Sequence, residues 1–266
     1  MSKKFLATGL NMVDKLVWPD GRKMTCMGGI PMYGFAGMRF WTGSSRDIAF
    51  GARVGKNFRD YYDPWFTDNG IDDSDLITVS DDTPYNTIYY EEDESVGRCD
   101  FFTGDFKDAV LWRPHGEDFR RWIGPETVGM YVCSGADDPM WPEVFSLKEK
   151  YGFKIMWEPN YINTFENSGE ATKKLLGKID MASFNVVEGS RLFGASSEED
   201  LLKKLEAYDN DLILLRAGSK GMHVISGHRS HMIPSAKVPQ GSSVVDVTGC
   251  GNTSTSGAFC ARCQGD

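Results

Sequence analysis

The chain has 266 residues, of which 41% are hydrophobic and 12% aromatic, so it is large enough to fold around a substantial core. Its 38 acidic and 29 basic residues give a net charge of −9, which disfavours binding to the phosphate backbone of nucleic acids. We expect no membrane-spanning helix, because no uninterrupted apolar stretch is long enough, and we expect no signal peptide. The predicted location is cytoplasmic.

Short apolar runs alternate with helical patterns along the first third of the chain. Strands are predicted at 5–10 and 47–54, and a Pro-Asp-Gly turn at 19–21 favours a hairpin between them. In 57–69 the aromatic residues recur at helical spacing, and Gly70 is a typical helix end. This order of elements is typical of an α/β fold.

Two hairpins interrupt the alternation. Besides the turn near residue 20, β-prone runs at 87–90 and 98–102 flank an acidic turn. Together the hairpins predict a small sheet outside the main domain, which would cover a cleft and exclude water from it. We therefore expect lid insertions at about 14–33 and 84–104, with exposed strand edges through which a second copy of the chain could form a homodimer.

The alternating pattern resumes near residue 127. Strands are predicted at 127–133, 153–157, 181–184, 212–215 and 222–225, and helices at 142–150, at 170–176 and after the Ser197 cap. This alternation predicts a mainly parallel sheet with helices on both faces. Ligands of such folds bind at the carboxyl ends of the strands.

A glycine loop near the end of the chain is the most informative segment. An apolar strand runs into Gly249-Cys250-Gly251 and then into a predicted helix, so backbone N–H groups and the helix dipole would form a nest for phosphate or an oxyanion. The alternative is a tight turn that binds nothing. No second strand follows the glycines, which excludes a dinucleotide-binding fingerprint, and GxxxxGK[ST] is absent, which excludes a Walker loop.

A cysteine cluster and a histidine cluster are weaker indications of a functional site. Cys260 and Cys263 form a single CxxC, for which two small helix residues are a better interpretation than a metal or redox site. His223, His228 and His231 lie in a polar turn that favours a hairpin loop over a metal site.

The loop Asp246-Val247-Thr248-Gly249-Cys250-Gly251-Asn252 resembles the DTxGxGDxF signature of the ribokinase-like (PfkB) carbohydrate kinases. Other family motifs are matched in the same order, over nearly the whole chain: Asp14 after Gly9, the pair Gly28-Gly29, Asn185-Val186-Val187-Glu188, and Ala217-Gly218-Ser219-Lys220-Gly221. The chain is therefore identified as a divergent member of this family. The resemblance implies a three-layer α/β sandwich over 1–266, with a central, mainly parallel sheet and a small β lid. Family members continue with further helix, so the resemblance also implies a truncated C-terminal part.

The resemblance implies a role for each matching position. The lid carboxylate and the di-glycine would bind the acceptor, the NxxE motif would hold Mg²⁺ through water, and the glycine loop would stabilise the transferring phosphoryl group. The implied catalytic residues are Asn252, Gly249, Cys250 and Gly251; the substrate-binding residues are Asp14, Gly28, Gly29 and Asn160; the cofactor-binding residues are Asn185, Glu188, Gly218, Lys220, Gly221 and Asp246; and the metal residue is Glu188.

Two departures from the family pattern bear on activity. Asn252 stands where the family has its catalytic Asp, and Glu158-Pro159-Asn160-Tyr161-Ile162 lacks the Arg of the family's DxNxR. An amide cannot take a proton near neutral pH, although it can orient a hydroxyl. We favour ATP- and Mg²⁺-dependent phosphoryl transfer to a hydroxymethyl group of a sugar or nucleoside. The alternatives are a pseudokinase that binds nucleotide or sugar, and an unrelated α/β enzyme whose glycine loop is fortuitous.

Overall fold

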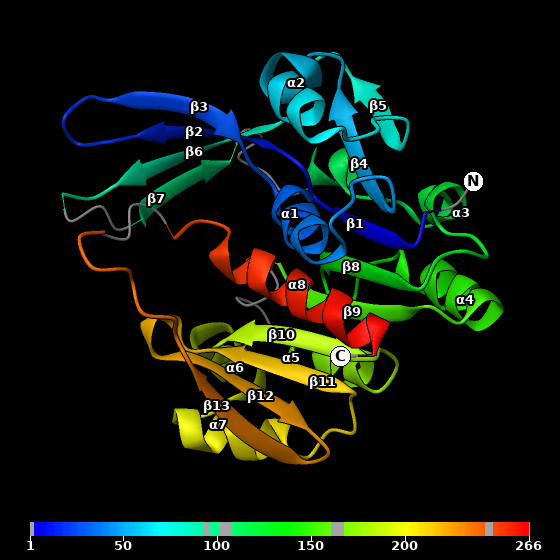
Figure 1. Ribbon diagram of the computed structural model, residues 1–266, viewed down its shortest axis with the longest axis vertical. Helices are drawn as coiled ribbons and strands as arrows, with labels where there is room; N and C mark the ends of the chain where they lie inside the picture. Colours follow the sequence, from blue (N-terminus) through cyan, green and yellow to red (C-terminus); the bar gives the residue numbers. More distant parts are fainter. Residues whose placement is uncertain (1–2, 93–95, 102–107, 161–167, 243–246, 266) are drawn as a thin grey trace.

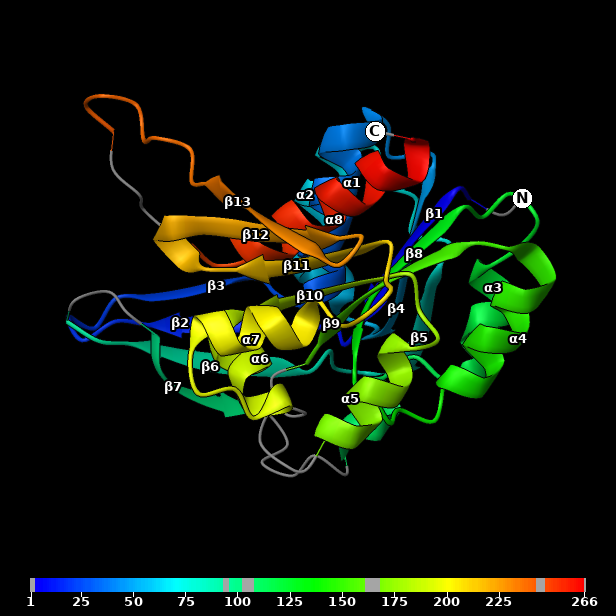
Figure 2. The same ribbon diagram turned by 90° about the horizontal axis from the view of Figure 1, so that it is seen from below.

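The computed structural model describes residues 3–92, 96–101, 108–160, 168–242 and 247–265. A nine-stranded sheet with the order β13-β12-β11-β10-β9-β8-β1-β4-β5 forms the centre of the molecule. Figure 2 shows this sheet between two layers of helices. The sequence prediction of a three-layer α/β sandwich is confirmed.

The strands of the large sheet are parallel from β11 to β5, and β12 and β13 add an antiparallel edge. The carboxyl ends of the parallel strands therefore meet at one edge of the sheet, where ligands bind in such folds. The strands are β1 (Phe5–Gly9), β4 (Ile48–Gly55), β5 (Leu76–Ser80), β8 (Gly129–Ser134), β9 (Lys154–Pro159), β10 (Met181–Asn185), β11 (Leu212–Arg216), β12 (Gly221–Ser226) and β13 (Arg229–Pro234).

The helices divide between the two faces of this sheet, as Figure 2 shows. One face carries α1 (Ile30–Thr42), α2 (Phe58–Asn69) and α8 (Cys250–Gln264). The other carries α3 (Phe119–Trp122), α4 (Trp141–Tyr151), α5 (Gly169–Leu176), α6 (Val186–Phe193) and α7 (Glu198–Leu205). Short 3₁₀ turns lie at Asp108–Trp112, Gly116–Asp118 and Gly218–Lys220. None of the helices in the described residues is both long and apolar enough to cross a membrane.

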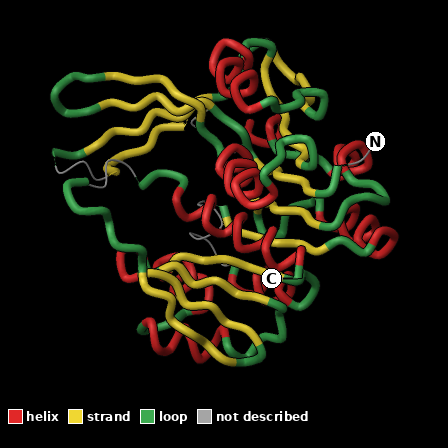
Figure 3. Tube along the Cα trace, in the orientation of Figure 1, coloured by secondary structure: helices red, strands yellow, loops and turns green. Residues whose placement is uncertain are grey.

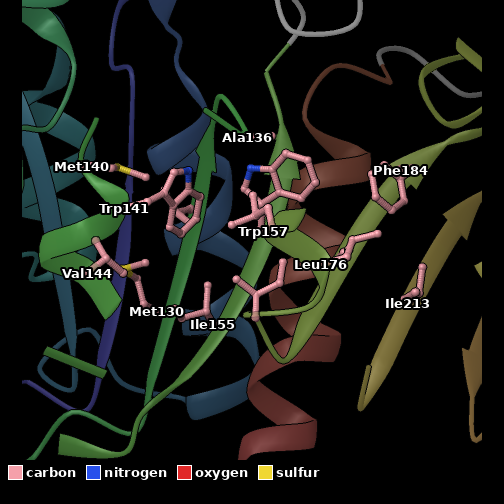
Figure 4. Packing of buried hydrophobic residues seen from close by; sticks show 14 of the residues in the cluster. Met130, Ala136, Met140, Trp141, Val144, Ile155, Trp157, Leu176, Phe184 and Ile213 are labelled. Carbon is pink, nitrogen blue, oxygen red and sulfur yellow. The ribbon is translucent and has the colours of Figure 1, made fainter. Parts of the chain in front are cut away.

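The core beneath α4 also fixes the end of strand β8. Trp141 and Trp157 are almost fully buried in the hydrophobic cluster drawn in Figure 4. The indole of Trp157 donates to the carbonyl of Ser134 at 3.0 Å, and that of Trp141 donates to the carbonyl of Gly135 at 2.8 Å. Because both buried N–H groups are satisfied at this point, the core holds the carboxyl end of β8 in a single position.

Helix α8 lies directly against α1, as Figure 1 shows. A Cβ on Gly37 would overlap the carbonyl oxygen of Thr253, and one on Gly34 would overlap the ring of Tyr131. Glycine at these positions lets the two backbones and the sheet approach closely. The helix α1 was not among the elements predicted from the sequence, and these same glycines weaken its helical pattern.

A second, four-stranded sheet projects from the body (Figures 1 and 3). It has the order β3-β2-β6-β7 and consists of two hairpins joined through the parallel pair β2 and β6. Its strands are β2 (Val13–Val17), β3 (Lys23–Met27), β6 (Tyr85–Tyr90) and β7 (Val96–Phe101). The small β lid predicted from the sequence is thus present. Residues from Ile30 onward belong to α1, and residues 93–95 and 102–104 of the expected insertions lie outside the described residues.

Candidate active site

The candidate site lies where the carboxyl ends of the central strands meet the beginning of α8. Tyr131 of β8, Glu158 of β9 and Arg216 of β11 are all on the α8 side of the sheet, and all three are mostly or fully buried. Charged groups are seldom buried without a partner, because leaving water costs several kcal/mol or more for each ion. The cluster therefore marks a site.

The glycine loop begins α8 directly above this cluster. Gly249 caps the helix with a φ of 76°, a conformation that favours glycine, and its α-carbon faces the ring of Tyr33 without room for a Cβ. The amide of Cys250 is bonded to the carbonyl of Val247 at 3.2 Å. The next amides, of Gly251 and Asn252, belong to the first helical turn and have no acceptor within the helix. With the helix dipole, they create a positive potential suited to an anion.

Asn252 contacts two of the buried groups. Its Nδ2 donates to Oε2 of Glu158 at 2.6 Å and to the hydroxyl of Tyr131 at 3.2 Å. The Tyr131 hydroxyl in turn donates to the same Oε2. Burial, followed by the charge of Glu158, raises the pKa of Tyr131 well above its usual value, so this hydroxyl stays protonated. The three side chains form a closed hydrogen-bonded triangle.

Arg216 supplies the positive charge of the cluster. Its Nη2 lies 3.3 Å from Oε1 of Glu158 and 3.6 Å from Oε2 of Glu188. Burial opposes its charge, yet the two carboxylates together hold the pKa of Arg216 above its usual value. A Cβ on Gly251 would overlap its Nη1, so the guanidinium touches the glycine loop. Within the described residues, its buried Nε has no hydrogen-bond partner.

The NxxE motif forms the start of α6. The side chain of Asn185 accepts from the amide of Glu188 at 2.8 Å, and the carboxylate of Glu188 accepts from the amide of Asn185 at 2.9 Å. This is a reciprocal capping box. Burial raises the pKa of Glu188, while the Asn185 amide and Arg216 act in the opposite direction. Because Oδ1 of Asn185 and Oε2 of Glu188 already accept hydrogen bonds in the cap, contact with a cation through water suits these two atoms better than direct coordination.

A cavity of about 380 Å³ lies beside the cluster. The turn between β11 and β12 forms one wall, and the start of α6 forms another. Lys220 on this turn reaches Glu198 at 3.4 Å, and His223 reaches the same carboxylate at 2.8 Å. The lining residues are Asn185, Val186, Val187, Glu198, Arg216, Ala217, Gly218 and Lys220, and Gly221 follows directly.

A separate buried carboxylate lies in the lid. Asp14 on β2 is 6% exposed, and a Cβ on Gly28 would overlap its carboxyl group. Burial raises its pKa to about 6, against the hydrogen bond from Asn86. Tyr62 accepts from the Gly28 amide at 3.1 Å and so fixes the backbone at the junction of lid and body. Gly29 follows with a φ of 88° and caps α1.

The structure brings most of the sequence-predicted site residues to one edge of the sheet. Asn160 follows β9 and lines a small cavity with Gly9 and Cys133, next to the ends of β1 and β8. Asp246 lies outside the described residues. Three residues of the cluster were missed as site residues, namely Tyr131, Glu158 and Arg216. Glu158 was named only as part of the segment that lacks the family's Arg, and Arg216 directly follows the strand predicted at 212–215. For these two, a charged residue at the end of an apolar strand was the available signal, whereas Tyr131 lies within β8 and has no such signal.

The cysteine and histidine clusters have ordinary structural environments. Burial raises the pKa of Cys263 to about 12 and raises that of Cys260 further, so neither thiol is activated. His223 pairs with Glu198, and the ring of His228 bonds to the carbonyl of Glu206 at 2.8 Å. In the part of the chain that the structure describes, no group of three His, Cys, Asp or Glu side chains could hold a metal ion.

Comparison with known proteins points to one family. Residues 41–265 match the profile described as pfkB family carbohydrate kinase. The chain is 27% identical over 121 residues to the ATP-dependent 6-phosphofructokinase of Thermoanaerobacterium thermosaccharolyticum. That alignment covers 44% of this chain and 36% of the relative, so the similarity spans about a third of the relative's length.

Solved structures of low sequence identity share the fold. Adenosine kinase from Sinorhizobium meliloti superimposes with a TM-score of 0.76 at 15% identity, covering 100% of this chain and 89% of the other. Ribokinase from Giardia lamblia gives a TM-score of 0.77 at 15% identity over 98% and 83% of the two chains. Fructokinase from Vibrio cholerae O395 gives 0.70 at 20% identity over 99% and 89%.

Proposed function

Because the chain belongs to the pfkB family of carbohydrate kinases, we propose that it transfers the γ-phosphoryl group of ATP to a hydroxymethyl group of a sugar or nucleoside. The observation that carries this proposal is the buried guanidinium of Arg216 against Gly251, at the beginning of α8. A cation and unpaired amides at one point are what a transferring phosphoryl group needs.

The nucleotide would occupy the cavity between the β11–β12 turn and the start of α6. Gly218 and Gly221 would border it, and the ammonium of Lys220 would reach its phosphates. Asn185 and Glu188 would hold Mg²⁺ through water, since their capping box fits a hydrated ion. When bound, Mg²⁺ would neutralise charge on the phosphates.

The phosphoryl group would lie between the glycine loop and Arg216. The amides of Gly251 and Asn252, which follow Cys250 in the first turn of α8, would donate to it, and Gly249 sets their direction. The guanidinium of Arg216, which touches Gly251, would add charged donors, which interact more strongly than neutral ones. These groups are fixed before substrate binds, so they would stabilise charge without rearranging.

The acceptor would bind between lid and body. Asp14 would accept a hydrogen bond from a hydroxyl, Gly28 and Gly29 would let the acceptor approach the backbone, and Asn160 would contact it from the sheet edge. The acceptor oxygen would form a bond to the γ-phosphorus as the bond to the β,γ-bridging oxygen breaks, and ADP would leave with that electron pair. Because the amide of Asn252 cannot take the hydroxyl proton, this proton would leave late, to the phosphoryl oxygens or to water.

We also propose a cytoplasmic location and pairing of two copies through the lid. The outer strands of the four-stranded sheet, β3 and β7, present backbone groups that a second sheet could pair with. Such a contact would join two lids without covering the sheet edge at α8.

A pseudokinase is the second candidate, and Asn252 is the observation that favours it. Loss of a general base typically costs about 10²- to 10⁴-fold in rate, which would leave binding intact. A panel of sugars, nucleosides and vitamins with Mg-ATP, scored by ADP release above the rate without acceptor, distinguishes the two. Acceptor-dependent release supports the kinase, whereas thermal-shift binding of ATP or sugar without release supports the pseudokinase.

A further inference from the structure

Glu158 is a buried carboxylate in direct contact with Asn252, the position that departs from the family pattern. Its side chain is 1% exposed and lies between Arg216 on one side and Asn252 with Tyr131 on the other. A fully buried carboxylate is costly unless each neighbour offers it a proton or a positive charge. All three neighbours do so here, and one of them is the residue that replaces the expected base.

The triangle determines which end of the Asn252 amide faces the acceptor. Oε2 of Glu158 accepts hydrogen bonds, and the Tyr131 hydroxyl already donates to it, so the group of Asn252 that points to both must be its NH₂. The Oδ1 of Asn252 therefore faces away from Glu158. That oxygen is an acceptor for a hydroxyl hydrogen at the beginning of α8.

We propose that Glu158 is a positioning residue for phosphoryl transfer. It fixes the carboxamide of Asn252 so that Oδ1 faces the attacking hydroxyl, and it carries the single negative charge shared by the Glu158–Asn252 pair. The inference rests on the proposed function. In this arrangement the carboxylate is at position 158 and the amide at 252, and the hydroxyl is oriented by Asn252 rather than deprotonated by it.

The arrangement makes the two positions interdependent. An Asp at 252, in the pose of Asn252, would place a second carboxylate at hydrogen-bond distance from Glu158. Two carboxylates this close cannot both ionise, so one of them would have to bind a proton. Restoring the family's Asp alone would therefore create repulsion, and removing the charge from Glu158 at the same time would relieve it.

A double-mutant cycle of Asn252→Asp, Glu158→Gln and the two together tests the inference. We expect Glu158→Gln to lower kcat about tenfold or more, with KM for ATP little changed, because the carboxamide of Asn252 can then rotate and exchange its NH₂ and Oδ1 positions. We expect Asn252→Asp alone to lose thermal stability progressively as the pH rises, because the folded protein must keep a proton on one of the two carboxyl groups at positions 158 and 252. The double variant should recover stability at high pH and exceed both single variants in kcat by at least about tenfold, with the carboxylate now able to act as a base.

Asp118→Asn is the matched control, because Asp118 is a buried carboxylate paired with Arg53 at 2.7 Å, away from the cluster. It should lower the unfolding temperature without changing kcat. A wild-type kcat in Glu158→Gln, or a double variant no more active and no more stable than the single ones, would overturn the inference. The stability measurements do not require catalysis. If the wild-type chain transfers no phosphate, the proposed function fails. The pH-dependent stability of Asn252→Asp, and its recovery in the double variant, still show whether positions 158 and 252 depend on each other.

Discussion

Two buried carboxylates lie in the regions that the proposed reaction brings together, and their surroundings differ. Glu158, at the end of β9, is 1% exposed and is surrounded by a guanidinium, a tyrosine hydroxyl and an amide. Asp14, in the lid, is 6% exposed, and burial raises its pKa to about 6 against the hydrogen bond from Asn86. The first carboxylate has a compensating charge built into the fold, whereas the second has an amide partner and, in the proposed function, would gain a hydroxyl of the acceptor. In that proposal the sheet edge is organised in advance and the lid depends on its ligand.

The largest effect on the contrast between Glu158 and Asp14 is expected from removing the guanidinium of Arg216. Arg216→Met would leave Glu158 and Glu188 buried without their cation, which we expect to lower the free energy of unfolding by about 3–5 kcal/mol. In the folded fraction, kcat should fall by about 10²- to 10³-fold, because the glycine loop loses a charged donor. Denaturant titration and ATP turnover measure the two effects. Lys203→Met is the control, since it removes an exposed cation paired with Glu199, and unchanged values in both variants would contradict the role of Arg216.

Filling the space beside the guanidinium is a milder way to disturb the same edge. A Cβ on Gly251 would push Nη1 of Arg216 aside, and we expect Gly251→Ala to lower kcat by up to about 10²-fold through misplacement. Gly257→Ala in the same helix is the matched control, because its Cβ would meet only ordinary contacts, and it should stabilise α8 by about 0.5–1 kcal/mol. Equal activity of the two variants would show that the space at Gly251 is not needed.

The lid carboxylate should make acceptor binding depend on pH. Because the pKa of Asp14 is raised to about 6, KM for the acceptor should fall as the pH rises through 6 and the carboxylate forms. Asp14→Asn should remove this dependence and raise KM about tenfold at pH 8, through loss of a charged hydrogen bond. Steady-state kinetics between pH 5 and 8 measure both. A wild-type KM that is flat across this interval would contradict the assignment.

Asp14 should also make the stability of the folded protein depend on pH, and the dependence should be opposite in sign to that of a carboxylate with a cationic partner. Its folded-state pKa lies above its ordinary value of 3.8, so the folded state loses stability as the pH rises from about 4 to about 6, and this loss persists above that interval. Asp14→Asn should therefore stabilise the unliganded protein at pH 8 by up to about 3 kcal/mol and have little effect at pH 4. Thermal unfolding at the two pH values provides the check.

The smallest effect is expected at the rim of the nucleotide cavity. Lys220 is exposed and pairs with Glu198 at 3.4 Å, so Lys220→Ala should raise KM for ATP only about two- to fivefold and leave kcat unchanged. A large fall in kcat would instead place Lys220 at the transferring phosphoryl group.

The sequence was sufficient for features that depend on neighbouring residues. The aromatic helix α2, its Gly70 end and the Ser197 cap of α7 follow from local spacing, and so does the glycine loop at the beginning of α8. The helix α1 was missed because Gly34 and Gly37, which its contacts with Tyr131 and α8 require, weaken its local pattern. Tertiary packing therefore overrides propensity at this helix.

The cluster at the sheet edge could not be derived in the same way. Tyr131 lies within β8, whereas Glu158 and Arg216 lie at the carboxyl ends of β9 and β11, and the three meet only because β8, β9, β10 and β11 lie next to one another in the sheet. Nothing near Asn252 in the sequence indicates that a glutamate 94 residues away accepts its hydrogen bond. This contact depends on the order of the strands in the sheet, which the alternation of strands and helices along the sequence does not determine.

The most direct test of the account follows labelled phosphate from [γ-³³P]ATP, with Mg²⁺ and with an acceptor that stimulates ADP release. Kinase activity predicts label in the acceptor, at a rate that depends on Mg²⁺ and is lower in Gly251→Ala than in the wild-type chain. Label that stays in ATP, or appears only as inorganic phosphate, would contradict transfer at the beginning of α8.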